Sequence, residues 1–354
     1  MTTNHNYYID LAFQIAEKNL GQTGQNPSVG SIVVKNNTVI SSGVTSTSGR
    51  PHAEYNALKK IKIASGSTLY TSLEPCIHQG KTPPCTDIII KKKIKTDVFG
   101  LEDPDPRTFK KAKKILKTKG IKTKLIKSKK YNNFYRSYLV NKKFKIPFIS
   151  AKIAISKDYY TINKKDKWIT NIFSRRNAHL IRSRHDGIIS TSKSINFDNS
   201  LLNCRIEGLN NYKPDLFIID LNIRLKKKLL LNKILKKRKT YIITYKKNIK
   251  KVQLYKKKGY RIIFISSLVN KNDFNLLFKK IYKMGYSRVL AETGLTFLNT
   301  LIKNRLINDL YIFNSNYNLN KKGENCAPLK LLKSIQSNPM SINLDNDSLY
   351  KKEF

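Results

Sequence analysis

The chain is poor in acidic residues, cysteine and long apolar runs. Its 354 residues hold 23 Asp and Glu against 69 Lys and Arg, which leaves a formal net charge of +46. Four cysteines are too few for a disulfide scaffold. No apolar run approaches the ~18 residues that a membrane span needs. The opening segment has neither a basic region nor a continuous apolar stretch, so we expect no signal peptide. These absences favour a soluble, cytoplasmic protein.

The length and the apolar content indicate a folded chain with two domains. Apolar residues make up 40% and aromatic residues 10%, which excludes global disorder. The basic residues are spread from Lys18 to Lys352, and only 13 of the 69 are Arg, the residue best suited to bidentate phosphate contacts. Lys, Asn and Ile are in excess, as in proteins of A+T-biased genomes. We therefore interpret the charge as compositional, with nucleic-acid binding as the alternative interpretation.

The first part of the chain alternates between helical and strand patterns. Apolar spacing predicts a helix over 8–20, and an Asn36-Asn37 turn predicts a hairpin. This alternation is typical of α/β layers around a central sheet. The predicted strands are 31–35, 38–44, 67–73 and 96–101, and the further helices are 52–61 and 86–94.

A polar, basic stretch at 129–147 predicts a domain junction, with domains at 1–146 and 147–354. The second domain also reads as α/β, with helices around 273–284 and 295–305. The charge run 225–239 is interpreted as a solvated helix or loop face. No repeat with a period of 20–50 residues is present. The predicted strands of this domain are 147–156, 186–191, 215–221, 240–245, 261–266, 287–293 and 309–314.

The strongest chemical signal is a His-x-Glu followed by two Pro-Cys pairs. One imidazole, from His52, and two thiolates, from Cys76 and Cys85, suit a tetrahedral Zn²⁺ with an open fourth position for water. Zinc lowers the pKa of such a water to about 7. Glu54 lies two residues from His52, where it can move a proton from water to a leaving amine. This pattern is that of the zinc deaminases.

Other interpretations of these residues remain. They could be a buried histidine and two core cysteines, or His78 could close a structural zinc site. Nucleic-acid deaminases usually show P-C-x-x-C, whereas eight residues separate Cys76 from Cys85. The intervening run IHQGKTPP carries a His and a Lys, which suits a small polar or phosphorylated substrate.

Several segments together resemble the bifunctional riboflavin-biosynthesis family, in which a pyrimidine deaminase is fused to a reductase. They are NPSVG (26–30), GRPHAE (49–54), LEPCIHQGKTPPC (73–85) and DPDP (103–106). The resemblance implies a cytidine-deaminase-like three-layer domain in which His52, Cys76 and Cys85 bind zinc and Glu54 is catalytic. It also places Asn26, His78, Lys81 and Asp103 at the substrate. The chain departs from the family at Thr45, near which a His is common, and at Asp105, where Asn is common.

The second domain carries weaker local signals. A strand, the turn Thr293-Gly294-Leu295-Thr296 and a helix follow one another, and the helix start could hold a phosphate or be an ordinary connection. DKWIT (166–170), IRSRHD (181–186), DNSLLNCR (198–205) and AETG (291–294) resemble segments of the reductase half of the same family. That resemblance implies a dihydrofolate-reductase-like fold that uses NADPH.

The resemblance also assigns residues in this half. The cofactor would lie on Ile155, Trp168, Ser194, Asp198, Gly294, Leu295 and Thr296. The sugar-phosphate substrate would lie on Asp166, Arg182, Leu202, Arg205 and Glu292. Two glycine positions of the family are replaced, one by Tyr159 and the other within Ser190–Lys193. Side chains there could crowd the cofactor.

These observations predict a two-step enzyme of riboflavin biosynthesis. Zinc-dependent deamination of a diaminopyrimidinone ribosylamino 5′-phosphate would precede NADPH-dependent reduction of its ribosyl group to ribityl. The expected partner is a small phosphorylated pyrimidine, with no specific nucleic acid and no membrane, and a homo-oligomer is left open. The alternatives are a tRNA base deaminase with a basic RNA-binding second domain and a non-enzymatic zinc-stabilised binding module.

Overall fold

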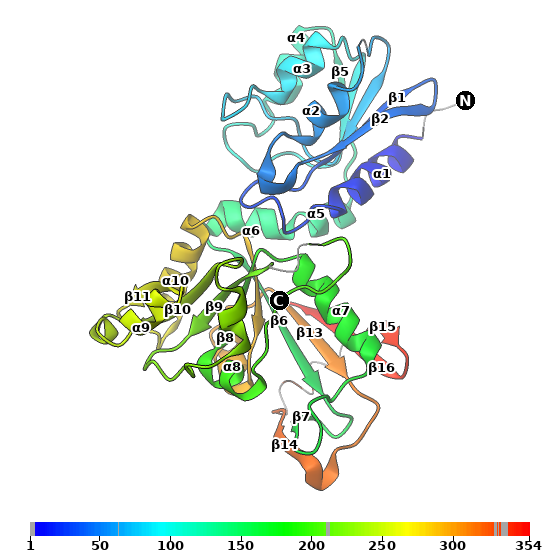
Figure 1. Cartoon of the computed structure of the whole chain (residues 1–354). Helices are drawn as coiled ribbons and strands as arrows, with labels where there is room; N and C mark the ends of the chain where they lie inside the picture. Colours follow the sequence, from blue (N-terminus) through cyan, green and yellow to red (C-terminus); the bar gives the residue numbers. More distant parts are fainter. Residues whose placement is uncertain (1–3, 63, 210–212, 329–330, 332, 334–338) are drawn as a thin grey trace. The chain divides into compact units, whose positions relative to one another are not determined.

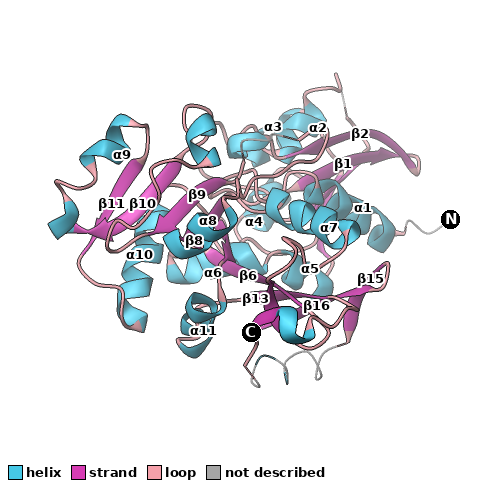
Figure 2. Ribbon diagram, turned by 60° about the horizontal axis from the view of Figure 1, so that its bottom comes forward, coloured by secondary structure: helices cyan, strands magenta, loops and turns pink. Residues whose placement is uncertain are grey.

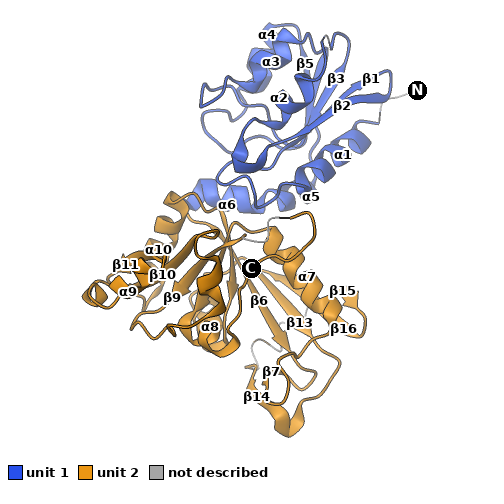
Figure 3. Ribbon diagram, in the orientation of Figure 1, with its two compact units in different colours: residues 1–145 blue, residues 146–354 orange. Residues whose placement is uncertain are grey.

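The computed structural model of the chain describes residues 4–62, 64–209, 213–328, 331, 333 and 339–354. The chain divides into two compact units, residues 1–145 and 146–354 (Figure 3). The polar stretch 129–147 is helical over most of its length. Within the described residues, no helix is both long and apolar enough to cross a membrane.

Unit 1 is built around a five-stranded sheet in the order β2-β1-β3-β4-β5 (Figure 1). β1 is antiparallel to β2 and β3, whereas β3, β4 and β5 run parallel. The predicted hairpin is confirmed, since Asn36 and Asn37 have φ angles of 49° and 59°, as a tight turn between twisted strands requires. The strands are β1 (Gly30–Lys35), β2 (Thr38–Val44), β3 (Thr68–Thr71), β4 (Thr96–Phe99) and β5 (Lys122–Leu125).

Helices cover both faces of this sheet, which gives three layers. On one face α1 packs with α5 and α6, and the rings of Phe13 and Tyr131 stack 4.2 Å apart. On the other face α2, α3 and α4 pack through Leu58, Ile89 and Leu116. The helices are α1 (His5–Glu17), α2 (Ala53–Leu58), α3 (Cys85–Lys91), α4 (Ala112–Thr118), α5 (Lys129–Phe134) and α6 (Arg136–Phe144).

Local contacts set where the first two helices lie. α1 begins before the predicted residue 8 because the side chain of Asn4 accepts a hydrogen bond from the Tyr7 N–H. α2 approaches β2 so closely at Gly43 that a Cβ there would lie 2.4 Å from the Ala53 carbonyl oxygen and from the Ala57 nitrogen. A glycine in β2 therefore fixes the position of the helix that follows His52.

Unit 2 contains a nine-stranded sheet in the order β11-β10-β9-β8-β12-β6-β13-β16-β15. The strands from β11 to β13 in this order are parallel, β16 pairs antiparallel with β13, and β15 pairs antiparallel with β16. β7 and β14 form a separate pair. The strands are β6 (Phe148–Ile155), β7 (Tyr160–Asn163), β8 (Gly187–Thr191), β9 (Asp215–Ile219), β10 (Thr240–Tyr245), β11 (Arg261–Ile265), β12 (Arg288–Glu292), β13 (Asp309–Asn314), β14 (Gly323–Cys326), β15 (Met340–Leu344) and β16 (Asp347–Glu353).

Helices cover both faces of this sheet as well (Figure 2). α10 and α11 pack on one face through Phe278 and Leu301, and α7 and α8 pack on the other through Ile181 and Ile195. All seven strands predicted for this half are confirmed; β7, β14, β15 and β16 were not predicted. The helices are α7 (Ile172–Ser183), α8 (Ser192–Asp198), α9 (Gln253–Lys257), α10 (Lys271–Lys283) and α11 (Leu295–Lys303).

The prediction that 225–239 is a solvated face is wrong for five of its fifteen residues, which are buried. Its lysines are exposed, but Leu225, Leu229, Leu231 and Leu235 are buried in the core of unit 2. Arg238 is only 2% exposed and donates hydrogen bonds to the carbonyl oxygens of residues 201, 202 and 214. The leucines do not lie on a regular helix and so have no helical spacing in the sequence. The lysines between them therefore made the run look polar throughout.

Candidate functional site

The three predicted metal ligands of unit 1 come together from different segments. His52 directly precedes α2, Cys76 follows β3, and Cys85 is the first residue of α3. Their ligand atoms all lie within 4.8 Å of one another. The sheet brings these segments together, because β3 leads to Cys76 and pairs with β1, and α2 packs on β1 and β2.

The spacing of these atoms fits a tetrahedral zinc ion. His52 Nδ1 lies 3.5 Å from Cys76 Sγ and 3.4 Å from Cys85 Sγ. Zinc bonds of about 2.0–2.3 Å at tetrahedral angles require about 3.5 Å between such atoms. The Cys85 side chain and then His52 hold the pKa of the Cys76 thiol below its usual value, which favours the thiolate form that binds metal.

Only three ligands belong to this cluster within the described part of the chain. The Nδ1 atom of His78, considered above as a closing fourth ligand, lies 3.3 Å from Thr108 Oγ1 and makes its contact there. A three-ligand set leaves one zinc position open, as catalytic sites do.

Glu54 lies beside the cluster, in the first turn of α2. Its side chain is 3% exposed, and its Oε2 atom has no hydrogen-bond partner among the described residues. Burial raises the pKa of Glu54 to about 7. A buried carboxyl group with a free oxygen can both accept and return a proton near neutral pH.

Asn26 supports the segment that leads to His52. Its Nδ2 donates a hydrogen bond to the Gly49 carbonyl oxygen at 2.9 Å. Gly49 has a φ of 88°, and a Cβ there would lie 2.6 Å from Asn26 Nδ2, so only glycine fits this contact. Asn26 therefore orders the chain before the metal ligands.

A buried carboxylate that we did not single out, Glu74, organises the loop that carries Asp103. Its two oxygens accept hydrogen bonds from the backbone N–H groups of Asp103, Lys110 and Ala112 at 3.0–3.1 Å. Asp103 Oδ1 accepts in turn from the Tyr138 hydroxyl at 3.0 Å, and burial raises the Asp103 pKa to about 6. The only signal in the sequence was a Glu next to the Pro-Cys pair.

The other predicted substrate residues of unit 1 are less closely joined. His78 contacts Thr108 through its Nδ1, and burial, followed by the charge of Arg107, lowers the pKa of its ring. Lys81 is exposed, and no hydrogen bond or ion pair ties it to the cluster within the described residues.

The two departures noted in unit 1 have local roles. Thr45 is buried, and its Oγ1 accepts a hydrogen bond from the Val29 N–H at 3.0 Å. Asp105 forms ion pairs with Arg107 at 2.6 Å and with Lys142 at 2.8 Å. These partners, chiefly Arg107, hold the Asp105 pKa below its usual range. Both side chains therefore serve the structure of the unit.

The carboxyl ends of three neighbouring strands define the candidate site of unit 2. β8, β12 and β6 are adjacent and parallel, so Thr191, Glu292 and Ile155 end at the same edge of the sheet. Ligands of open parallel sheets bind at this edge. Of the predicted residues, Ile155 is fully buried there.

An ion pair joins two predicted substrate residues at this edge. Arg182 donates to both carboxylate oxygens of Glu292, from Nε at 2.5 Å and from Nη2 at 2.8 Å. Burial opposes the charge of Glu292, but Arg182 outweighs it and lowers the Glu292 pKa to about 2. Lys152 of β6 is close enough to act on the same carboxylate. Lys152 was missed, although it is the one charged residue of its strand.

The predicted cofactor residues Ser194 and Gly294 are in contact. The Gly294 N–H donates to Ser194 Oγ at 3.1 Å, and Gly294 is the N-cap of α11. Thr296 is exposed in the first turn, whereas the Leu295 side chain packs against the core. Leu295 can therefore offer a ligand its backbone N–H at the start of α11.

The remaining predicted residues of unit 2 are more dispersed. Asp198, at the end of α8, lies in electrostatic range of Lys167, Lys152 and Glu292. Trp168 is 47% exposed, with the Arg175 guanidinium 4.8 Å from its ring centre. Asp166 accepts from the Trp168 N–H. Leu202 has its side chain in the core.

The two replaced glycine positions carry side chains with defined local conformations and contacts. Tyr159 adopts a left-handed φ of 69°, which a glycine would adopt more easily. Ser190 Oγ donates to the Glu292 carbonyl oxygen at 2.7 Å, and Ser192 Oγ donates to Asp220 at 3.0 Å. These hydroxyl groups are thus bound to protein partners.

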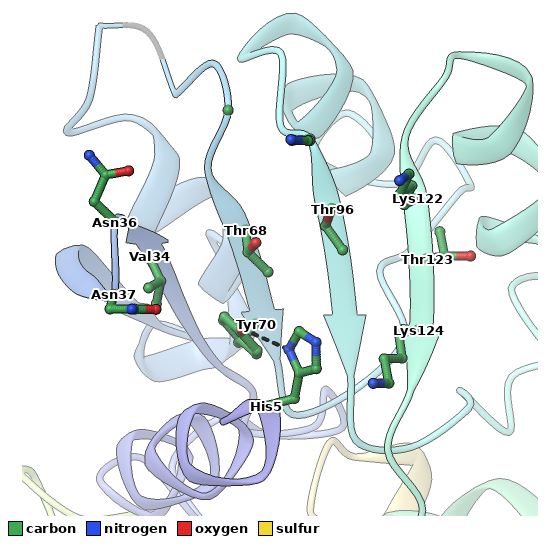
Figure 4. Close-up of a pocket in the computed structure, with 12 residues that line it drawn as sticks. His5, Val34, Asn36, Asn37, Thr68, Tyr70, Thr96, Lys122, Thr123 and Lys124 are labelled. Atoms are coloured by element: carbon green, nitrogen blue, oxygen red, sulfur yellow. Dashed lines mark hydrogen bonds between the residues drawn. The ribbon is translucent and has the colours of Figure 1, made fainter. Parts of the chain in front are cut away.

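A separate hollow of about 560 Å³ lies in unit 1, at the amino-terminal ends of β3, β4 and β5 (Figure 4). His5 Nδ1 and the Tyr70 hydroxyl lie 2.9 Å apart within it. Its basic lining, Lys95, Lys122 and Lys124, is what the composition of the chain provides in many places. β3 leads to Cys76 from its other end, so the hollow is not the metal centre.

Comparison with known families supports both halves of this description. Residues 2–101 match the cytidine and deoxycytidylate deaminase zinc-binding region, and residues 147–316 match the RibD C-terminal domain. The structure superposes on Acinetobacter baumannii RibD with a TM-score of 0.82, at 24% identity and with 98% of each chain covered. A deaminase/reductase from Thermotoga maritima gives a TM-score of 0.80, at 24% identity and with 99% of each chain covered. The predicted α/β fold of both halves is thereby confirmed.

Sequence relatives extend over most of the chain. The riboflavin biosynthesis protein RibD of Aquifex aeolicus is 30% identical over 315 residues, which cover 86% of this chain and 85% of the relative. The RibD protein of Buchnera aphidicola is 31% identical over 322 residues, which cover 87% and 86%. The chain belongs to the RibD family of riboflavin biosynthesis proteins.

Proposed function

We propose that the chain carries out two successive reactions of riboflavin biosynthesis. Unit 1 replaces an amino group of a diaminopyrimidinone ribosylamino 5′-phosphate by oxygen from water and releases ammonia. Unit 2 then reduces the ribosyl group to ribityl with NADPH. The observation that supports this best is the His52, Cys76 and Cys85 triad, with its open position, beside the buried Glu54. Membership of the RibD family does not favour the tRNA deaminase alternative.

In unit 1, His52, Cys76 and Cys85 would hold zinc. When bound, zinc supplies the Lewis acidity that makes water a nucleophile near neutral pH. Glu54 takes a proton from the attacking water and delivers it to the departing amine. Its raised pKa, about 7, suits both transfers. Asn26, His78, Lys81 and Asp103 are proposed to line the pyrimidine site.

In unit 2, NADPH would supply a hydride from a site at the carboxyl ends of β6, β8 and β12. The exposed first turn of α11 offers backbone N–H groups for a cofactor phosphate. The cofactor residues proposed are Ile155, Trp168, Ser194, Asp198, Gly294, Leu295 and Thr296. The substrate residues proposed are Asp166, Arg182, Leu202, Arg205 and Glu292.

Replacing the proton carrier tests the first reaction. In a Glu54→Ala variant we expect ammonia release to fall by a factor of about 10² or more, the usual contribution of a positioned acid–base group. Zinc content, measured by atomic absorption, should stay at the wild-type level because no ligand is changed. Retained deaminase turnover in this variant would contradict the mechanism.

NADPH oxidation tests the second reaction. The wild-type protein, given the deaminated intermediate, should consume NADPH, as followed by the loss of its absorbance. A Cys85→Ser variant should retain this activity while losing ammonia release, because the metal ligand belongs to unit 1. Deamination without any NADPH consumption would rule out the proposed role of unit 2.

A further inference from the structure

His179, on α7, lies between the two arginines of the proposed reductase substrate site. Its Nδ1 atom is 3.0 Å from the Asn203 carbonyl oxygen, and its Nε2 atom is 3.2 Å from Nη2 of Arg205. Nη1 of Arg182 is 3.1 Å from the same carbonyl oxygen. The histidine therefore links α7 to the segment that carries Arg205.

These contacts determine which nitrogen of His179 carries the proton. Nη2 of Arg205 can only donate, so Nε2 accepts from it and the neutral ring carries its proton on Nδ1. Nδ1 faces the Asn203 carbonyl oxygen, and the Arg205 backbone N–H, at 3.2 Å, and Arg182 Nη1, at 3.4 Å, lie beside it. Burial, followed by the charges of Arg182 and Arg205, lowers the His179 pKa to about 4. The ring is neutral at physiological pH and keeps this acceptor available.

Arg182 and Arg205 differ in how their charges are compensated. Arg182 is neutralised by its two hydrogen bonds to Glu292. Arg205 has no carboxylate partner in the described part of the chain. Its guanidinium is held by neutral acceptors, His179 Nε2 and Asn203 Oδ1, the latter at 3.2 Å. Such an arrangement orients the guanidinium and leaves its positive charge for an anion.

We propose that His179 is a positioning residue that orients Arg205 toward the phosphate group of the reductase substrate. The proposal rests on the function proposed above for unit 2 and on the contacts of one imidazole. It explains why a half-buried histidine is placed among cations: a neutral ring can support one arginine side chain without competing for the phosphate that this side chain binds.

The test compares variants of His179 with a control on the same helix. His179→Ala removes the acceptor, so we expect the KM for the deaminated intermediate to rise about tenfold, as for loss of a hydrogen bond to a charged group. The KM for NADPH and kcat should change less than twofold. His179→Gln, whose amide oxygen can replace Nε2, should recover most of the loss. Arg176→Ala, on an exposed part of α7, should resemble the wild type.

A double variant shows whether His179 acts through Arg205. If it does, His179→Ala should add little to the KM of an Arg205→Ala protein. Full additivity, an unchanged KM in His179→Ala, or equal shifts in both KM values would overturn the proposal. Calorimetric binding of the deaminated intermediate provides the same comparison without turnover. A wild-type protein that binds the intermediate but consumes no NADPH would contradict the proposed function of unit 2. The calorimetric affinities of the same variants would then decide the role of His179.

Discussion

Single buried polar residues hold the loops around both candidate sites. Glu74 fixes the loop of Asp103 through three backbone N–H groups, and Arg238 ties together three carbonyl oxygens of unit 2. His185 does the same for α7. Its Nδ1 lies 2.8 Å from the Ile181 carbonyl oxygen, and its Nε2 lies 2.9 Å from Ser150 Oγ. Burial of each of these polar groups is favourable only while its hydrogen-bond partners are in place.

The buried His185 predicts a pH-dependent stability of unit 2. Burial lowers the pKa of His185 from 6.5 to about 3. Between these two pH values the histidine is protonated in the unfolded chain but stays neutral in the folded chain. This stabilisation is complete above pH 6.5 and is lost as the pH falls toward 3. Between pH 7.5 and pH 5 we expect the free energy of unfolding to lose about 2 kcal/mol from this group.

A neutral variant isolates that contribution. The free energy of unfolding can be followed by the fluorescence of Trp168, the single tryptophan of the chain, which reports on unit 2. Asp186, whose pKa burial raises to about 7, has the opposite effect, since its folded form gains a proton first as the pH falls. Asp186 is present in both wild type and His185→Gln, so its effect cancels when the two are compared. The difference in their free energies of unfolding should therefore be about 2 kcal/mol smaller at pH 5 than at pH 7.5. A constant difference would contradict the prediction.

At the scale of elements, several helices of this chain end on left-handed residues other than glycine. α3, which begins with the proposed ligand Cys85, is followed by Lys93 at a φ of 56°. The Ile94 N–H then bonds back to the Ile89 carbonyl oxygen, and the Lys93 N–H bonds to that of Ile90, as in a Schellman motif. A lysine at this position carries a steric cost that glycine avoids.

A Lys93→Gly substitution should therefore stabilise the end of α3 by about 1 kcal/mol. The measurement is hydrogen exchange of peptides that span residues 85–94, in which the amides should exchange about fivefold more slowly. Lys91→Gly, within the last turn of the same helix, serves as the matched control and should speed exchange, because glycine is unfavourable inside a helix. Faster exchange in Lys93→Gly would contradict the motif.

At the scale of the whole molecule, the charge of +46 greatly exceeds what the two proposed sites require. The 23 acidic residues cannot pair with 69 basic ones, and exposed lysines are present in both units. Such a surface attracts polyanions without specificity and repels itself. The charge is therefore a general property of the surface and is separate from the proposed reactions.

This view predicts weak, salt-dependent binding to RNA. Affinities for tRNA and for heparin should fall together as salt rises, with no measurable tRNA binding at about 0.15 M salt. Ammonia release from the small pyrimidine should be unaffected by added tRNA under these conditions. A tRNA affinity that persists at physiological salt, while heparin binding disappears, would instead support a nucleic-acid substrate.

Local patterns in the sequence predicted four of the five strands of the first sheet, all but β5, and seven of the nine strands of the second sheet. They also predicted the Asn36-Asn37 hairpin and the types of residue at the metal centre. Each depends on neighbours within a few positions: alternation along a strand, a turn dipeptide, or His-x-Glu before a helix. The resemblance of longer segments determined the family. The strands β7, β14, β15 and β16 and the buried side of 225–239 lacked such a signal, because lysines and polar residues interrupt their apolar patterns.

Tertiary structure alone decided which polar groups meet. The pairing of Arg182 with Glu292, 110 positions apart, follows from the placement of β12 beside β8, an order that no local pattern contains. Tertiary contacts also bring His179 to Arg205 in unit 2 and bury the Glu74 carboxylate among backbone N–H groups in unit 1. The sequence by itself determined the chemistry that is available, since residue types carry it. The fold decided the partners and the burial of each group, because these depend on strand order and on contacts between distant segments.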